Sequence, residues 1–231
     1  MKYIKFGLLS IASIIILSSL VHAGEAENKG LAISKEAKSR DNGWTDTQAE
    51  MEMILKNQHG QTSTRQMKIK SMEQQNDGDK SLTVFESPRD VKGTAFLSFS
   101  HAVGNDEQWL YLPALKRVKR ISSRNKSGSF MGSEFSFEDL TSFEIEKYTY
   151  KYVKDEIANG VDCYVVEQTP IDKNSGYKRR MVWIDKAEYR TQKTDFYDRK
   201  NTLLKTLTMK DYQQYVDKYW RASQLEMINH Q

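Results

Sequence analysis

The sequence predicts a mainly β protein built around one large, strongly curved antiparallel sheet or barrel. Three observations support this. Apolar residues recur with period two along most of the chain, as in half-buried strands. Turn signals separate these stretches, at Asn76-Asp77-Gly78, Asn159-Gly160 and Asn174-Ser175-Gly176. Helical patterns are confined to the flanks, so the sheet itself must provide most of the buried surface.

The N-terminus predicts a cleaved signal peptide at residues 1–23. Lys2 and Lys5 precede an apolar stretch that runs to Val21, and Val21-His22-Ala23 has small residues, Val21 and Ala23, at the two positions that a signal peptidase reads before a cut after Ala23. The alternative is a membrane anchor, but the apolar stretch is short for a span of about 20 residues and contains several serines. We therefore expect an exported protein with one mature domain at residues 24–231.

Two helical segments are expected. Leu31 to Arg40 has the pattern of an N-terminal helix that stops at Asp41-Asn42-Gly43, and a short helical turn is expected from Glu138 to Phe143.

The expected strands follow in chain order. Alternation is clearest around Met51–Leu55, Met67–Ile69 and Tyr148–Tyr152. Asn159-Gly160 is the strongest signal for a two-residue hairpin. Further strands are expected at Leu82–Glu86, Thr94–His101, Gln108–Leu112, Arg117–Ile121, Val161–Gln168, Tyr177–Asp185, Tyr189–Tyr197 and Leu203–Asp211.

Composition excludes two classes of protein. Cys163 is the single cysteine, so no disulfide scaffold is possible, and its alternating context indicates a small core residue. The formal net charge is +4, and two of the cations lie in the predicted signal peptide. A nearly balanced chain does not have the strongly basic face typical of a nucleic-acid binder, so no nucleic-acid partner is expected.

The residues expected to face the interior of the sheet are unusually rich in methionine and aromatic rings. Flexible thioethers and broad rings suit a cavity for acyl chains, although the same residues also make ordinary packed cores. The candidate lipid-binding residues are Met51, Met53, Met67, Phe85, Phe96, Leu97, Phe99, Trp109, Tyr111, Phe130, Met131, Phe135 and Phe137.

A basic segment follows these strands and is the candidate docking surface for a partner. Its residues are Lys116, Arg117, Lys119, Arg120, Arg124 and Lys126. Clustered cations attract anionic lipid head groups or acidic proteins and orient the protein on them, so peripheral membrane contact is one interpretation. The alternative is a solvated edge strand that charge protects from aggregation. Strand periodicity places Lys116 and Arg120 on one face and Arg117 and Lys119 on the other.

No pattern predicts catalysis, a metal or a cofactor. His59, His101 and His230 have no ligand partner at a recognisable spacing, and Ser127-Gly128-Ser129 does not match a nucleophile elbow. A hydrolase that uses His101 is the weakest hypothesis, because a lone histidine usually has a structural role. The expected protein is not an enzyme.

One segment resembles a known family. The resemblance is carried by KGTAFLSFSH at residues 92–101 and by the following QWLYLPALKRVKRIS and SGSFMGSEFSFEDL. The segment resembles the outer-membrane lipoprotein-sorting proteins, a branch of the LolA/LolB-like superfamily. The similarity covers residues 92–140 most closely. It implies an incomplete antiparallel β-barrel, with an N-terminal helix and short helices covering the open side. No counterpart of the arginine that holds the lid of LolA can be placed by motif.

The resemblance also implies a function. Similarity to this family implies a periplasmic carrier or chaperone that binds acyl chains of a lipoprotein or lipid for transfer toward the outer membrane. An inner-membrane exporter is the candidate partner. The alternative from a different class is an adaptor subunit of an envelope lipid-export complex, which would have a filled core and would work through its basic segment.

Overall fold

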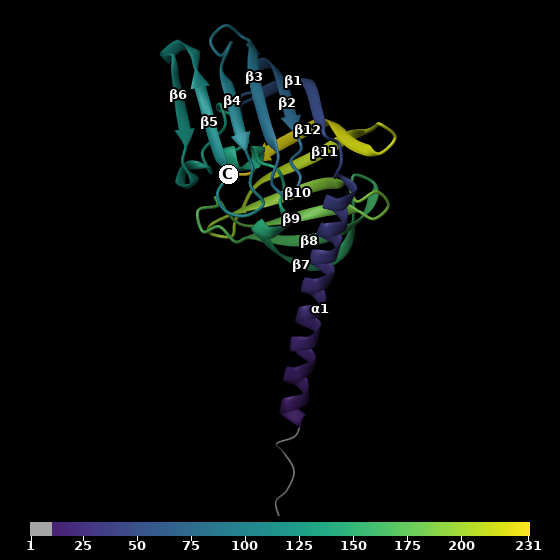
Figure 1. The fold of residues 1–231 in the computed structure, drawn as a ribbon. Coiled ribbons are helices and arrows are strands. Elements are labelled where there is room, and N and C mark those ends of the chain that lie inside the picture. The colour runs from purple at the N-terminus through teal and green to yellow at the C-terminus, as the bar shows by residue number, and fades with distance from the viewer. Residues whose placement is uncertain (1–10) are drawn as a thin grey trace, which may run out of the picture.

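Two six-stranded antiparallel sheets and one long helix make up the part of the protein that the structure describes. The computed structural model describes the backbone of residues 11–231 and the side chains from Gly24 onward. In Figure 1 the strands of the first sheet run steeply across the direction of those of the second sheet. The sheets do not join into a closed barrel, and each contains six consecutive strands of the chain. The predicted mainly β fold and incomplete LolA-like barrel are confirmed.

Each sheet is a meander in which strands adjacent in sequence are paired. The first sheet contains β1 (Asp46–Lys56), β2 (Thr62–Met72), β3 (Lys80–Ser87), β4 (Ala95–Phe99), β5 (Glu107–Leu112) and β6 (Arg117–Ile121). The second contains β7 (Tyr148–Ala158), β8 (Val161–Pro170), β9 (Tyr177–Asp185), β10 (Thr191–Asp198), β11 (Leu203–Tyr215) and β12 (Tyr219–Asn229).

The helices are one long element and four short turns. They are α1 (Ile11–Arg40), η1 (Pro113–Leu115), η2 (Ser123–Asn125), η3 (Phe137–Leu140) and η4 (Ile145–Lys147). The segment between β6 and β7 therefore crosses from one sheet to the other and carries η2, η3 and η4. Among the described residues, no helix is both long and apolar enough to span a bilayer.

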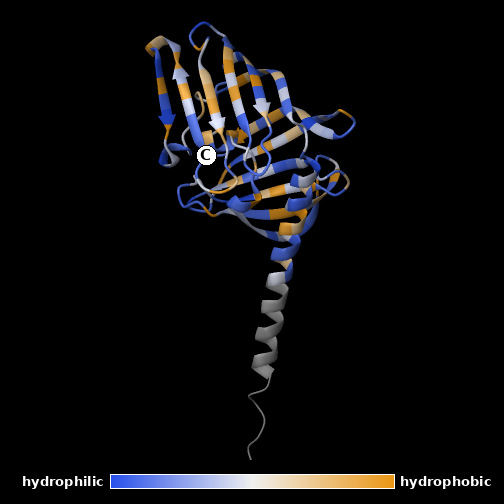
Figure 2. Ribbon diagram, viewed as in Figure 1, coloured by the Kyte–Doolittle hydropathy of each residue, from blue (hydrophilic) through white to orange (hydrophobic). Residues whose placement is uncertain are grey.

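Alternation along the strands decides which side chains meet inside the molecule. Figure 2 shows apolar and polar residues alternating along both sheets. In the first sheet, Met51 lies opposite Met67, and Met67 lies opposite Phe85. Directly opposed residues share a face, so these side chains belong to one inward surface, which continues through Phe96 and Leu110.

The inward face of the second sheet is covered by the C-terminal part of α1, which runs along β7 (Figure 1). Ile33 is 5% exposed and packs with Tyr150, Val166 and Val182. A Cβ on Gly30 would lie 2.6 Å from the backbone nitrogen of Tyr152. Helix and strand backbones therefore approach so closely that only glycine fits at this position.

Several predicted boundaries are correct and others are not. The hairpin at Asn159-Gly160 joins β7 and β8 with positive φ at both residues, as predicted. The N-terminal helix ends at Arg40 and, within the described residues, extends back to Ile11, well before the predicted start at Leu31. The short turn spans Phe137–Leu140 rather than Glu138 to Phe143. The predicted signal peptide lies outside the described residues, apart from the helical backbone of residues 11–23.

One strand was missed. The sequence of β12 has no alternation, and most of its side chains are exposed. The turn before it is formed by Val216 and Asp217, which adopt φ values of 51° and 52°. Asn and Gly usually occupy such positions, so this turn carries no sequence signal.

Candidate functional site

The inward face of the first sheet carries a single apolar cluster rich in methionine and phenylalanine. Its most deeply buried rings are Phe85 and Phe96, each 1% exposed, and Phe130, which is 2% exposed. Nine predicted lipid-binding residues belong to the cluster or pack against it: Met51, Met53, Met67, Phe85, Phe96, Phe130, Met131, Phe135 and Phe137.

The structure does not bring the other four predicted residues to this cluster. Leu97 lies opposite Trp109, and Ala95 lies opposite Tyr111, on the outward face of the same strands. Phe99 is on that face too, and its ring centroid lies 5.3 Å from that of Trp109. Phe96 and Leu97 are consecutive, and consecutive residues of a strand point to opposite faces, so both cannot be inward. Phe96 is the buried one.

The segment of residues 127–140 covers the cluster, and we call it the cover loop. It ends in the short helix η3, whose Phe137 and Leu140 also pack on the cluster. The Phe130 ring of the loop lies 5.1 Å from Phe96 and 5.9 Å from Phe85, and Phe137 completes the ring group at 5.8 Å from Phe130. The contacts between the loop and the sheet at this point are therefore mainly between apolar rings.

A tight turn shapes the tip of the cover loop. Met131 and Gly132 have φ values of 52° and 76°, so the chain reverses there. The Phe130 amide donates to the Phe135 carbonyl at 2.7 Å, and the Ser133 hydroxyl donates to the Phe130 carbonyl at 2.7 Å. These bonds close the turn internally and point Phe130 toward the sheet.

A buried ion pair ties the cover loop to the second sheet. Lys205 Nζ lies 2.6 Å from Asp139 Oδ2, and the two side chains are 4% and 6% exposed. Lys205 also donates to the Glu134 carbonyl at 2.7 Å. The Tyr177 hydroxyl donates to Asp139 Oδ1 at 2.7 Å. Burial and the neighbouring Asp139 carboxylate raise the pKa of Tyr177 far above its usual range, so this hydroxyl stays a donor.

A second attachment follows at the next residue. Glu138 accepts the Gly176 amide at 2.8 Å and the Ser175 hydroxyl at 2.9 Å. Burial raises the pKa of Glu138, against the opposing effect of these donors and of Lys126. The C-terminal end of the cover loop is thus held by polar contacts to the second sheet and its β8–β9 loop.

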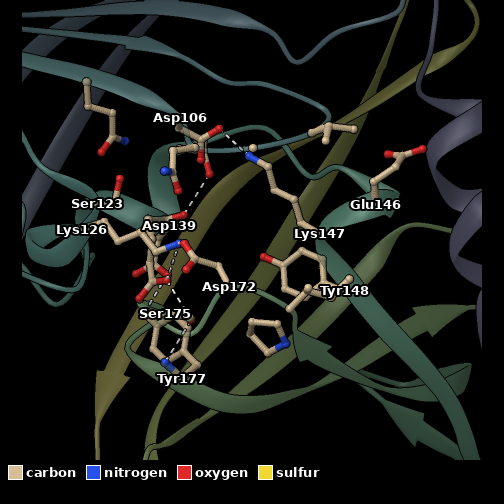
Figure 3. A pocket seen from close by; sticks show the side chains of 18 of the residues that line it. Asp106, Ser123, Lys126, Asp139, Glu146, Lys147, Tyr148, Asp172, Ser175 and Tyr177 are labelled. Carbon is tan, nitrogen blue, oxygen red and sulfur yellow. Dashed lines mark hydrogen bonds and ion pairs between the residues drawn. The ribbon is translucent and has the colours of Figure 1, made fainter.

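A cavity of about 300 Å³ adjoins the cluster at Ile121. Several charged side chains lie along its wall (Figure 3). Lys126 lies 2.6 Å from Asp172, and Lys147 pairs with Asp106. Burial of Asp172 opposes its ionisation, but Lys126 and Asn174 outweigh it and hold the pKa of Asp172 below its usual value. Ile121 belongs both to the cavity wall and to the apolar cluster. The cavity therefore borders the cluster with charged groups that are already paired.

Arg180 also lines the cavity, and its guanidinium is held by an amide and an aromatic ring. Its Nε and Nη2 donate to Gln168 Oε1 at 2.9 and 2.7 Å, and its guanidinium lies 4.1 Å from the Tyr148 ring centroid. No carboxylate pairs with it among the described residues. A second cavity, of about 380 Å³, is lined by the cover loop together with Tyr177 and Lys205.

The predicted docking residues lie at several separate places in the structure. Lys126 faces the cavity, while Arg120 lies on β6 and pairs with Glu107 at 2.9 Å. Arg117 and Lys119 lie opposite Leu112 and Leu110, so they share the inward face, and both are exposed. Lys116 precedes the strand, and Arg124 lies in η2.

His101 and Cys163, the other side chains considered for chemistry, lie in surroundings that suit a structural role. His101 contacts Asp77 at 2.9 Å and Glu107 at 3.7 Å. Cys163 is fully buried, as expected for a core residue, and burial raises its pKa. No group of three or more His, Cys, Asp or Glu side chains suited to a metal ion occurs within the part of the chain that the structure describes.

Comparisons with known proteins agree with this architecture. A family model described as "-like: Uncharacterized protein" matches residues 77–231. A crystal structure from Vibrio parahaemolyticus, described as an outer membrane lipoprotein-sorting protein domain, is 64% identical, with a TM-score of 0.87 over 88% of this chain and 86% of that chain. The chain belongs to this lipoprotein-sorting family.

More distant structures extend the comparison. A DUF1329 family protein from Desulfovibrio piger is 30% identical to this chain, with a TM-score of 0.83 over 88% of this chain and 86% of that chain. A LolA superfamily protein from Nitrosomonas europaea is 18% identical, with a TM-score of 0.69 over 87% of this chain and 86% of that chain, which shows a shared fold. No curated protein sequence matches the chain.

Lys205 belongs to the site but was not among the residues predicted from the sequence. It stands between Leu204 and Leu207 in a strand, and it lies opposite the buried Phe196. A lysine on the apolar face of an alternating strand is the signal that could have found it, because such a cation needs a buried partner.

Proposed function

We propose that this protein is a periplasmic carrier that holds acyl chains of a lipoprotein or lipid against the inward face of the first sheet, for transfer toward the outer membrane. The observation that supports the proposal is the cover loop. It places Phe130 and Phe137 on a sheet face that is rich in methionine, phenylalanine, leucine and isoleucine. An acyl chain that displaced these rings would meet the same apolar surface.

The energetics suit a carrier that must also release its cargo. Burial of a chain of about 14 methylene groups contributes on the order of 11 kcal/mol before entropic costs, at about 0.8 kcal/mol per group. When the acyl chain enters, the protein loses the contacts of Phe130 with Phe85 and Phe96. The net affinity is therefore lower than the gross value, which allows the chain to be passed on.

The methionines offer a route to the buried rings. Met51, Met53 and Met131 are only partly buried where they pack against the cluster. Phe135 packs against both this cluster and the one around Phe196 on the second sheet. Apolar surface thus continues from one sheet to the other, and the flexible thioethers can adapt to chains of different shape.

The name of the Vibrio relative supports the class of cargo. That protein is described as an outer membrane lipoprotein-sorting domain, and it is 64% identical to this chain. A lipoprotein presents acyl chains that need cover from water between two membranes. A periplasmic location follows from this role and from the predicted signal peptide.

Two neighbouring residues of β1 provide the test. Met53 faces the cluster, while Ile54 is 60% exposed on the opposite face. Binding of dansyl-undecanoic acid to delipidated protein is measured by fluorescence for wild type, Met53→Asp and Ile54→Asp. We expect Met53→Asp to weaken binding at least about tenfold, because a carboxylate on an apolar ligand surface costs more than 1.4 kcal/mol. Ile54→Asp leaves the affinity unchanged.

Folding of both variants is checked by circular dichroism. Met53 lies opposite Arg65 in the β1–β2 register, so an aspartate there has a cationic neighbour and the strand pairing is retained. Absence of saturable binding to wild type, or equal weakening by both substitutions, contradicts the proposal.

A further inference from the structure

Strand β6 forms one edge of the first sheet. It pairs with β5 alone and is the last strand in the sheet order, at the outer side of the molecule in Figure 1. Four of its five residues are exposed, and only Ile121 is buried. One row of backbone N–H and C=O groups on this strand is therefore available to another chain.

The cations on this edge have few internal partners. Arg120 pairs with Glu107 at 2.9 Å. Across the described residues, no carboxylate forms an ion pair with Lys116, Arg117 or Lys119. Uncompensated charge concentrated on one strand attracts an anionic partner and steers it during association.

The distribution of these cations over the two faces constrains what the partner can be. Arg117 and Lys119 lie opposite Leu112 and Leu110 and share their inward face. Arg120 lies opposite Trp109 and shares the outward face. A flat membrane surface against either face would meet only part of this charge. A strand added beside β6 would meet all of it, because its side chains alternate between the same two faces.

We propose that β6 is a docking edge for an extended acidic segment of a partner protein, which adds to the first sheet as a further antiparallel or parallel strand. Backbone hydrogen bonds hold the segment in line with β6. Carboxylates at successive positions face Arg117 and Lys119 on one side and Arg120 on the other. Arg117 and Lys119 share a sheet face with the acyl-chain site, but strand addition at β6 does not depend on acyl-chain binding.

A second copy of this chain is a poorer match for the edge. Pairing β6 with β6 would bring cations directly opposite cations. The other free edge of this sheet, β1, carries Glu50 and Glu52, which lie opposite Lys68 and Gln66 on the outward face. Its carboxylates would reach Arg120 and leave the inward cations unpaired. The edge therefore favours a different protein as partner.

The probe is a fluorescein-labelled synthetic peptide, Thr-Glu-Glu-Val-Glu-Glu-Thr, with blocked ends. Its binding to the full chain is measured by fluorescence anisotropy at low salt. Two further peptides carry N-methyl groups at alternate residues, in the odd or the even set, which removes the donors on one edge of the peptide at a time. One methylated peptide is expected to bind like the parent and the other at least about tenfold more weakly, since several backbone hydrogen bonds of about 1 kcal/mol are lost.

A charge-reversed protein gives the second arm. Arg117→Glu, Lys119→Glu and Arg120→Glu together are expected to abolish binding of the parent peptide. The matched control is Lys56→Glu, Lys70→Glu and Lys178→Glu, an equal charge change at exposed strand positions away from β6. Retention of binding by the control supports the assignment.

Three results overturn it. Equal binding of both methylated peptides and the parent would show ionic contact without strand addition. Equal loss in the β6 and control variants would show a response to net charge alone. No saturable binding of the parent peptide would leave the edge without an acidic partner.

Discussion

The two sheets bury their inward faces by different means. The second sheet is covered by α1, where Gly30 brings the helix against the backbone of β7 and Ile33 enters the core. The first sheet is covered by a loop that inserts Phe130 and is attached by Asp139 and Lys205. A helix seated on backbone is replaced only by moving the whole helix. In the proposed function, the cover loop leaves its place while the sheet remains intact.

This difference assigns distinct roles to the two halves. Under the proposed function, the second sheet and α1 provide a fixed base, and the first sheet provides the surface that exchanges its cover. The cover loop meets the base through polar groups, at Lys205 and Tyr177. It meets the first sheet through rings, at Phe85 and Phe96, and through two of its carbonyls, which accept from Arg65 and Gln108. Release of the apolar contacts therefore does not require loss of the ion pair.

The largest effect is expected when the attachment is removed. Lys205→Met leaves the Asp139 carboxylate buried without its cation, which costs about 3–5 kcal/mol when one partner of a buried pair is lost. Urea unfolding measures the loss. Hydrogen exchange in residues 127–140 should rise more than in α1. The control is Lys210→Met on the same strand, because its ion pair with Glu226 is exposed and is worth about 0–1 kcal/mol.

Equal destabilisation by the two substitutions would break the comparison, because the buried pair would then contribute no more than a surface pair. Faster exchange spread evenly over α1 and the cover loop would show that one cooperative core holds both.

A smaller effect is expected at the helix. Gly30→Ala places a methyl group 2.6 Å from the Tyr152 nitrogen, so α1 must shift, at a cost of about 1–3 kcal/mol for overpacking. Gly24→Ala in the same helix meets nothing within 4 Å and is expected to cause no loss. Chemical denaturation of both variants measures the difference. If Gly30→Ala is as stable as wild type, the base is not fixed in the way the contact implies.

Local patterns predicted most strands but not how they are covered. Alternating residues such as Tyr148 and Tyr150 identified β7, and Asn159-Gly160 identified its hairpin, because both signals lie within a few residues. The outward positions of Leu97 and Trp109 depend on which face the cover loop contacts, and alternation alone leaves that choice open.

The candidate site was predicted in part for the same reason. The methionine and phenylalanine content pointed to the residues around Phe96, and nine of them meet in one cluster. The pairing of Asp139 with Lys205 joins positions that are distant in sequence, and neither residue has a local signal for the other. Long-range polar contacts of this kind are fixed by the fold, so they emerge only when the two sheets are in place.

The smallest expected effect is a pH dependence confined to the loops of the first sheet. Asp77 accepts the Ala102 amide at 2.8 Å and contacts His101 Nδ1 at 2.9 Å, and these bonds lower the pKa of Asp77 from 3.8 to about 2. The unfolded chain therefore binds a proton at this carboxyl at higher pH than the folded chain does. Its stabilising contribution is present above about pH 4 and is lost as the pH falls toward about 2.

Asp77→Asn removes this contribution, so the difference in thermal midpoint between wild type and variant is the quantity to follow. We expect wild type to be more stable at about pH 6, with the difference shrinking as the pH approaches about 3. Ala102 also lines the cavity beside the cluster, so this contact links the β2–β3 and β4–β5 loops at the cavity wall. A difference that stays constant with pH would mean that Asp77 acts through geometry alone. The acid sensitivity of the first sheet would then have to originate elsewhere, at carboxylates such as Asp172, whose pKa is also lowered.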